Sequence, residues 1–242
     1  MSPTRAEPAD WTPPDRRRIR AIYRRLDTYF GGELAPPRAA DPLDELVLTV
    51  LSQHTSDLNA ERAFADLQRV FPGGWQQVVD APTVGVADAI RSGGLANSKA
   101  PRIQAILREV HDREGSFDLS SLRALSDDDA RDYLIGLPGI GPKTAAVVLS
   151  FALGRDAMPV DTHVHRVTRR LGIVPDKASA ERADRILHDL VPDGLRTPLH
   201  VAFIRLGREI CKAPIPRCAQ CPLKDLCPTA PRYLPAARRR TR

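Results

Sequence analysis

The sequence predicts an all-α fold, because its apolar residues recur with the period of a helix. Ile19, Ile22, Leu26 and Tyr29 lie three or four positions apart, which places them on one face of a helix over residues 14–30. No pair of alternating apolar runs joined by a tight turn indicates a β-hairpin. The 22 prolines fall mostly between the periodic segments, where connectors are expected.

Start and stop signals divide the rest of the chain into further helices. The Thr-Ser-Asp cluster at 55–57 is typical of a helix start, and Gly115 ends a second strongly periodic run. Ser126 with Asp129 three residues later resembles a capping box, and Gly154 resembles a C-terminal stop. The other predicted helices cover residues 43–51, 81–90, 127–136, 142–153, 162–171, 178–190 and 198–212.

The composition favours a globular protein with a polyanionic partner. Of 242 residues, 42% are apolar and 27% are charged, and the net charge is +6. The longest apolar-rich stretch, residues 144–153, is about half of a membrane span, and the first residues lack the apolar segment of an export signal. We therefore expect a cytoplasmic protein with no membrane partner.

A short turn that carries a lysine is the most informative motif. Residues 137–143 read Leu-Pro-Gly-Ile-Gly-Pro-Lys, and the two glycines let the backbone turn tightly and approach a ligand. Pro142 suits the first position of a helix, whose free amides form a site for a phosphate. Lys143 would lie beside that phosphate, and Asp161 follows just beyond the helix. This pair indicates chemistry on nucleic acid, whereas the plainer interpretation is a turn with a solvated lysine.

All four cysteines lie in one segment near the C-terminus, and their spacing is C-x6-C-x2-C-x5-C: Cys211, Cys218, Cys221 and Cys227. In a cytosolic chain, clustered thiols are more often metal ligands than disulfide partners. Four thiolates can hold either zinc or an iron–sulfur cluster, and the spacing alone leaves both open. Lys212 and Arg217 fall between the first two cysteines, where a metal-fixed loop would present them to phosphate; two solvated surface charges are the alternative.

Taken together, residues 20–228 resemble the endonuclease III family of DNA glycosylases, within the helix–hairpin–helix superfamily. The hairpin, the lysine, the aspartate and the cysteine quartet occur in the family's order. The resemblance implies two helical lobes flanking a DNA-binding cleft: a six-helix barrel over 44–154, and a cluster lobe formed by 14–43 and 155–230. Residues 1–13 and 231–242 are expected to be loose tails. The resemblance also implies that the four cysteines ligate a [4Fe-4S] cluster, with a structural and electrostatic role.

The resemblance assigns roles to two further loops. Residues 51–55 resemble the loop whose glutamine, here Gln53, fills the hole left by an extruded nucleotide. Residues 94–100 resemble the loop whose leucine, here Leu95, wedges into the opposite strand. Inserted side chains of this kind offset the cost of base flipping.

The hairpin residues Gly139, Ile140 and Gly141 would grip a DNA phosphate, as in relatives that also hold a monovalent cation there. The sequence departs from the best-known members at His54 and His165, and its segment 118–133 is longer than in the compact members. These departures would change the shape of the pocket that receives the damaged base, so the resemblance does not define the preferred lesion.

The implied function is that of a bifunctional glycosylase of base excision repair, a monomer acting on double-stranded DNA with oxidised pyrimidines or abasic sites. Lys143 would attack the sugar C1′, and the resulting Schiff base would permit β-elimination. Asp161 would stabilise positive charge at C1′ and help to deprotonate the amine. One alternative is a mismatch glycosylase for adenine or thymine, which commonly has serine or tyrosine in place of Lys143. The other is a non-catalytic iron–sulfur module that only binds DNA.

Overall fold

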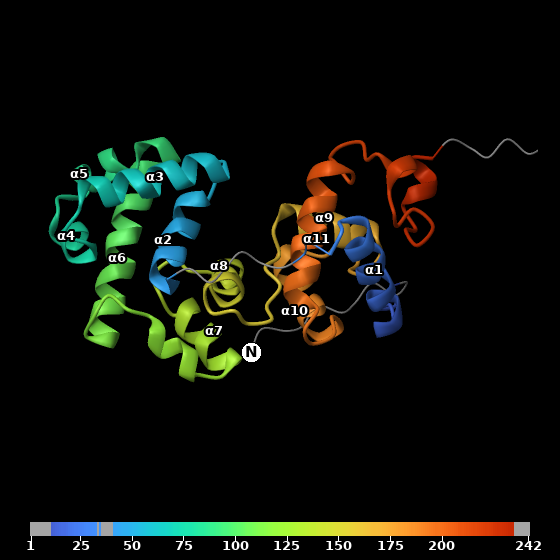
Figure 1. The fold of residues 1–242 in the computed structure, drawn as a ribbon, viewed down its shortest axis with the longest axis horizontal. Coiled ribbons are helices and arrows are strands. Elements are labelled where there is room, and N and C mark those ends of the chain that lie inside the picture. The colour runs from blue at the N-terminus through green and yellow to red at the C-terminus, as the bar shows by residue number, and fades with distance from the viewer. Residues whose placement is uncertain (1–10, 33, 35–40, 235–242) are drawn as a thin grey trace, which may run out of the picture. The chain divides into compact units, whose positions relative to one another are not determined.

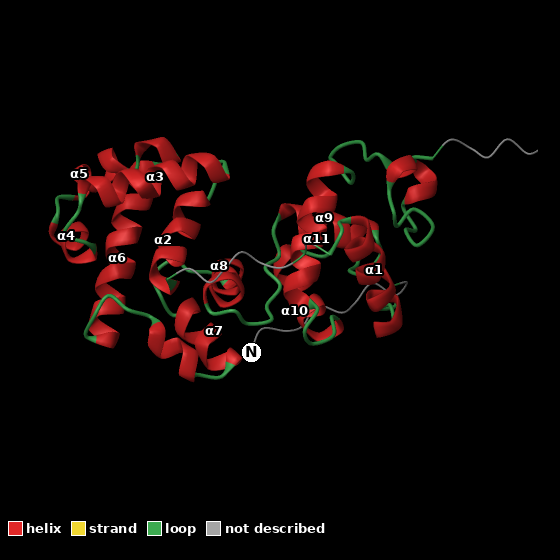
Figure 2. Cartoon of the chain, in the orientation of Figure 1, coloured by secondary structure: helices red, strands yellow, loops and turns green. Residues whose placement is uncertain are grey.

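The structure is a computed structural model, and it describes residues 11–32, 34 and 41–234. Residues 1–10 and 235–242 of the two predicted tails lie outside the described residues. Every regular element within the described ranges is helical and none is a strand (Figure 2), which confirms the predicted all-α class. In this part of the chain, no helix combines the length and the apolar character that crossing a bilayer requires.

The chain divides into two compact units, and we name each after its principal motif. The hairpin unit comprises residues 37–155, and the cysteine unit comprises residues 1–36 and 156–242. Within its described residues, each unit has its own buried apolar core.

The hairpin unit is built around helix α2 (Pro42–Ser52) (Figure 1), most of whose residues are buried. Asp41 caps this helix, since its carboxylate accepts hydrogen bonds from the Leu43 and Asp44 amides at 2.9 and 3.1 Å. Helix α2 packs against α3, α6 and α8. The other α-helices of the unit are α3 (Asp57–Val70), α4 (Trp75–Asp80), α5 (Thr83–Ala89), α6 (Ala96–Glu114), α7 (Asp127–Ile135) and α8 (Pro142–Val147).

Two predicted helices of this unit have different bounds in the structure. The predicted helix 81–90 is the shorter α5, and the sequence analysis missed α4 before it. The buried Gln104 holds this corner: it donates hydrogen bonds to the carbonyls of Val78 and Ala81 and accepts one from Thr83. The predicted helix 142–153 is α8 followed by a π-helical turn over Val148–Ala152.

The predicted caps are confirmed. Ser56 accepts a hydrogen bond from the Asn59 amide at 3.3 Å and begins α3. Ser126 accepts one from the Asp129 amide at 3.1 Å, which is the N-cap half of a capping box, and its hydroxyl donates to the Asp129 carboxylate at 2.6 Å. Gly154 has φ of +67° directly after the π-helical turn, as a C-terminal stop requires.

The cysteine unit packs four α-helices around a second core. They are α1 (Arg16–Tyr29), α9 (Thr162–Arg170), α10 (Ala180–Leu190) and α11 (Arg196–Glu209), and α11 packs against both α1 and α9. The predicted apolar face of α1 is buried at Ile19, Ile22 and Leu26, whereas Tyr29 at the end of the helix is exposed. After α11 the chain carries the cysteine segment, with short 3-10 helices at Cys218–Gln220 and Ala230–Arg232.

Candidate active site and cysteine cavity

The hairpin turn has the geometry that its sequence predicts. The Ile140 amide donates to the Leu137 carbonyl at 3.2 Å, and Gly139 between them has φ of +71°. Proline followed by a glycine with positive φ is the pattern of a type II turn. The amides of Gly139 and Gly141 bond to no other described residue. Ile140 is buried, so its side chain anchors the turn in the core and only its backbone is available to a ligand.

Lys143 lies in the first turn of α8, directly after Pro142 at the helix start. Its side chain is exposed and lines an open hollow of about 830 Å³, mouth included, whose other walls come from α2, α3 and the π-helical turn. Glu45 and Thr49 of α2 also line this hollow, and Thr49 donates a hydrogen bond to Glu45 at 3.3 Å. Burial raises the pKa of Glu45 above its usual value. The sequence did not indicate that Glu45 lies near Lys143, because the two residues are far apart in the chain and line the same hollow only in the folded structure.

Asp161 belongs to the cysteine unit and caps α9. Its Oδ1 accepts a hydrogen bond from the Val164 amide at 2.7 Å, and within the described part of the chain Oδ2 makes no hydrogen bond. The preceding segment is fixed by α11, since Thr197 bonds both the amide and the carbonyl of Ala157, and His200 bonds the Pro159 carbonyl at 2.8 Å. The local fold therefore fixes the backbone that carries Asp161 and orients its carboxylate.

The two loops predicted to enter DNA share an uncommon backbone feature. Among the described residues, the non-glycine residues with positive φ are His54, at +58°, and Leu95, at +49°. His54 directly follows Gln53, and Leu95 is 56% exposed despite its apolar side chain. Left-handed backbone costs an L-residue about 1–2 kcal/mol, and such strain concentrates at functional sites. Both loops thus combine exposure with strain.

Two side chains of α6 contact these loops, and the sequence analysis did not single them out. Arg102 donates a hydrogen bond from Nη1 to Oε1 of Gln53 at 2.9 Å. Lys99, which is 3% exposed, donates from Nζ to the carbonyls of Leu51 and Gly93 at 2.6 and 2.8 Å. Burial and the neighbouring Arg102 lower the pKa of Lys99.

The four cysteines line one cavity in the cysteine unit. Its volume is about 390 Å³ with its mouth, and its walls are otherwise formed by α9, α11 and the segment after them. As placed among the described residues, no three His, Cys, Asp or Glu side chains form a group that would hold a single metal ion. Burial raises the pKa of the Cys218 and Cys227 thiols, and that of Cys221 to about 11. Thiolates in this cavity therefore need positive charge beside them.

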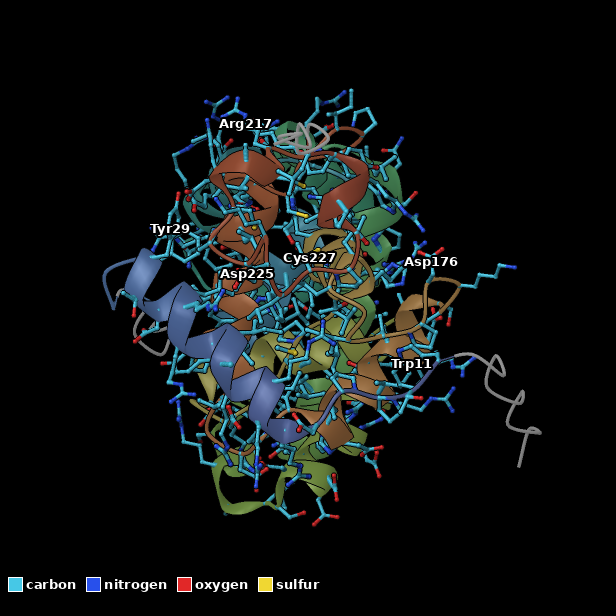
Figure 3. All side chains as sticks on the ribbon, turned by 90° about the vertical axis from the view of Figure 1, so that its right-hand side faces the viewer. Trp11, Tyr29, Asp176, Arg217, Asp225 and Cys227 are labelled. Carbon is cyan, nitrogen blue, oxygen red and sulfur yellow. The ribbon has the colours of Figure 1, made fainter. Side chains whose placement is uncertain are left out.

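Arginines of α9 hold the loop between the first two cysteines. Arg170 donates hydrogen bonds to the carbonyls of Cys211, Lys212 and Pro214 at 2.8–3.1 Å and approaches Cys211 Sγ at 3.4 Å. Arg166 bonds the Cys211 carbonyl as well, at 2.9 Å. Lys212 and Arg217, the two predicted phosphate contacts, are exposed on this loop, and Figure 3 shows Arg217 projecting outward whereas Cys227 lies among packed side chains.

Comparison with known proteins places these features in a family. Residues 47–193 match the model of the HhH-GPD superfamily of base excision DNA repair proteins. A protein of Arabidopsis thaliana provisionally named a DNA glycosylase is 39% identical over 70% of this chain, which spans 57% of that relative. Endonuclease III of Thermotoga maritima is 35% identical over 78% of this chain and 84% of its own length. A solved non-covalent endonuclease III–DNA complex matches with a TM-score of 0.74 and 30% identity, covering 90% of this chain and 98% of that one.

The chain belongs to the HhH-GPD superfamily of base excision DNA repair proteins. Within that superfamily it is similar to endonuclease III, which confirms the resemblance drawn from the order of its motifs.

Proposed function

We propose that this protein is a bifunctional DNA glycosylase that removes oxidised pyrimidines and then cleaves the abasic site by β-elimination. The observation that carries the proposal is the position of Lys143, exposed in the first turn of α8 immediately after a turn whose two glycine amides bond to no other described residue. Those amides are suited to a DNA phosphate, and a bound phosphate would bring a sugar within reach of the amine. The family and its endonuclease III relatives support the same activity.

The reaction uses the ε-amine of Lys143 as the nucleophile. Nζ attacks C1′ as the bond from C1′ to the base breaks, and the bonding electrons leave with the base, which takes up a proton. Opening of the sugar at O4′ gives an imine between Nζ and C1′. Loss of a proton from C2′ then expels the 3′ phosphate and cuts the strand. Lys143 is exposed in the structure, so its amine is accessible to a bound sugar.

Asp161 is the proposed electrostatic partner. Its Oδ1 is engaged by the α9 amide, so Oδ2 would stabilise positive charge at C1′ and accept a proton from the amine. Gln53 and Leu95 would occupy the space vacated by the extruded base and its partner, while Gly139, Gly141, Lys212 and Arg217 would contact phosphates.

We infer that Cys211, Cys218, Cys221 and Cys227 hold a [4Fe-4S] cluster, and the resemblance to endonuclease III supports this choice over zinc. The donor set fits, because four thiols from one 17-residue segment line a common cavity. When bound, the cluster supplies the positive charge that buried thiolates need and fixes the loop carrying Lys212 and Arg217. Iron and acid-labile sulfide content, compared between wild type and Cys221→Ser, tests this inference; loss of both from a folded variant is expected.

Borohydride trapping tests the proposed function. The purified protein, Lys143→Gln and the control Lys177→Gln, which changes another exposed lysine, are each incubated with three duplexes. These carry an oxidised pyrimidine, an abasic site or a T:G mismatch. We expect a covalent adduct with the oxidised pyrimidine and the abasic site for wild type and Lys177→Gln, and none for Lys143→Gln.

Two other results of the trapping experiment would each favour a different function. Base release from a mismatch without an adduct indicates a monofunctional mismatch glycosylase. Absence of any adduct or base release from a protein that contains its cluster refutes the lysine mechanism and favours a non-catalytic DNA-binding module.

A further inference from the structure

The amide group of Gln53 is held at both ends before any DNA is bound. Its Oε1 accepts the hydrogen bond from Arg102 at 2.9 Å, and its Nε2 lies 3.5 Å from Oγ1 of Thr144. Thr144 is buried and directly follows Lys143 in α8. The two contacts fix the direction of the Gln53 side chain relative to the helix that carries the nucleophile.

Arg102 also lies against the hairpin. A Cβ atom built on Gly139 would be 2.9 Å from Nε of Arg102 and 3.2 Å from its Cδ, closer than side chains normally approach. The guanidinium therefore occupies the space that the missing side chain of Gly139 leaves. One arginine thus joins the hairpin turn to Gln53 within the hairpin unit.

Lys99, one helical turn before Arg102, donates hydrogen bonds to backbone carbonyls of both loop segments. The Leu51 carbonyl lies just before the Gln53–His54 turn, and the Gly93 carbonyl lies just before the loop tip at Leu95. The backbone amide of Lys99 donates to the Leu95 carbonyl at 3.0 Å as well. Lys99 therefore bonds the carbonyls of Gly93 and Leu95 at the second loop, and the Leu51 carbonyl three residues before the strained His54.

We propose that Arg102 and Lys99 of α6 are positioning residues that hold Gln53 and Leu95 ready for insertion into the duplex. The inference rests on the proposed function, since it assumes that these two side chains enter DNA. Side chains already ordered in the free protein lose less entropy on binding. Arg102 acts on the direction of Gln53, and Lys99 acts on the backbone that supports both loops.

A double-mutant cycle tests the role of Arg102 in the full-length protein. Arg102→Met, Gln53→Ala and the double variant are compared with wild type for binding a duplex that carries a tetrahydrofuran abasic analogue. The control is Arg108→Met, which removes the same charge from an exposed position of α6. 2-Aminopurine opposite the analogue reports displacement of the opposite base by fluorescence, without any chemistry.

We expect Arg102→Met to bind the analogue duplex roughly two- to tenfold more weakly than Arg108→Met, the range set by freeing one long side chain. In the Gln53→Ala background, Arg102→Met should weaken binding of the analogue duplex no more than Arg108→Met does. KM should rise with the Kd, whereas the trapping rate at saturating substrate should stay at the wild-type value. Lys99→Met should speed amide exchange across residues 92–98, whereas Arg108→Met should not.

The inference is overturned if Arg102→Met binds the analogue duplex as tightly as the control, or if its effect on binding persists in the Gln53→Ala background, which would mean that Arg102 acts through the hairpin or through DNA and not through Gln53. Either result leaves trapping by Lys143 intact. If the wild-type protein binds the analogue duplex no better than an undamaged duplex and gives no adduct, the proposed function fails and this inference fails with it.

Discussion

Replacing each hairpin glycine by alanine, one at a time, is expected to separate the folding role of the turn from its role in DNA binding. At Gly139, with φ of +71°, a left-handed alanine costs about 1–2 kcal/mol. The new Cβ would also displace Arg102, which lies 2.9 Å away, and weaken its bond to Gln53. With about 1 kcal/mol for that bond, we expect Gly139→Ala to destabilise the protein by about 2–3 kcal/mol.

Gly141→Ala, two residues further on, is expected to leave stability nearly unchanged and serves as the control for Gly139→Ala. The φ of Gly141, −104°, is open to any residue, and apart from its two chain neighbours no described residue has an atom within 4 Å of the position that an alanine methyl would take there. Alanine gains about 0.4–1 kcal/mol by restricting the unfolded chain and loses about as much because it is a poor helix cap. We therefore expect stability to change by less than about 0.5 kcal/mol, since the two effects oppose each other. The methyl would, however, obstruct a phosphate approaching the Gly141 amide.

Thermal unfolding and fluorescence anisotropy with the abasic-analogue duplex measure the two effects. A loss of about 2–3 kcal/mol in a chain of this size corresponds to a Tm fall of roughly 4–12 °C, expected for Gly139→Ala alone. Weaker duplex binding at unchanged Tm is expected for Gly141→Ala. If Gly141→Ala binds as tightly as wild type, the hairpin amides do not grip the DNA. If Gly139→Ala keeps its Tm, the argument from positive φ and close approach is wrong.

Substitutions at three other positions give further predictions. Asp161→Asn keeps an N-cap for α9, so its Tm should stay near wild type while borohydride trapping falls at least tenfold; Asp161→Ala should lose about 1 kcal/mol of stability as well. Leu95→Asn should stabilise the protein by about 1 kcal/mol, because asparagine tolerates left-handed backbone, yet it should weaken binding to the lesion duplex. Glu45→Gln should raise Tm at neutral pH. The pKa of Glu45 is raised in the folded protein, so the native state binds more protons than the unfolded state. The wild-type protein therefore loses stability as pH rises above 4.5, the usual pKa of this group. The Tm increase caused by Glu45→Gln should vanish below that pH.

The fold was largely predictable because most helices carry their own signals. The apolar period, the serine caps at 56 and 126 and the stop at Gly154 are all local, and the structure confirms them. Helix α4 was missed because it has six residues and its N-cap residue, Gly74, offers no side-chain cap. Its C-terminal carbonyls are satisfied by Gln104, which lies 26 residues from Val78 in the chain, and no local pattern reveals such a bond.

In the candidate site, too, the features set by nearby residues could be predicted, and those set by long-range contacts could not. The turn around Gly139 and the position of Lys143 follow from short-range sequence, so the motif places them correctly. The bonds from Lys99 to Leu51 and from Arg102 to Gln53 span 48 and 49 residues. In the sequence nothing distinguishes Lys99 and Arg102 from other charged residues, and only the packing of α6 against α2 reveals their partners.

The burial of Lys99 has a physical reason that links stability to function. A charged amine buried at this depth lowers stability unless it is fully bonded, and an apolar side chain there would leave the Leu51 and Gly93 carbonyls without a donor. Those carbonyls lie where the chain leaves regular helix to form the strained turns at His54 and Leu95. Strained backbone persists only when its surroundings over-determine it. A lysine with two strong acceptors supplies that constraint from the core side, so the solvent-facing side of both turns remains free to meet a ligand.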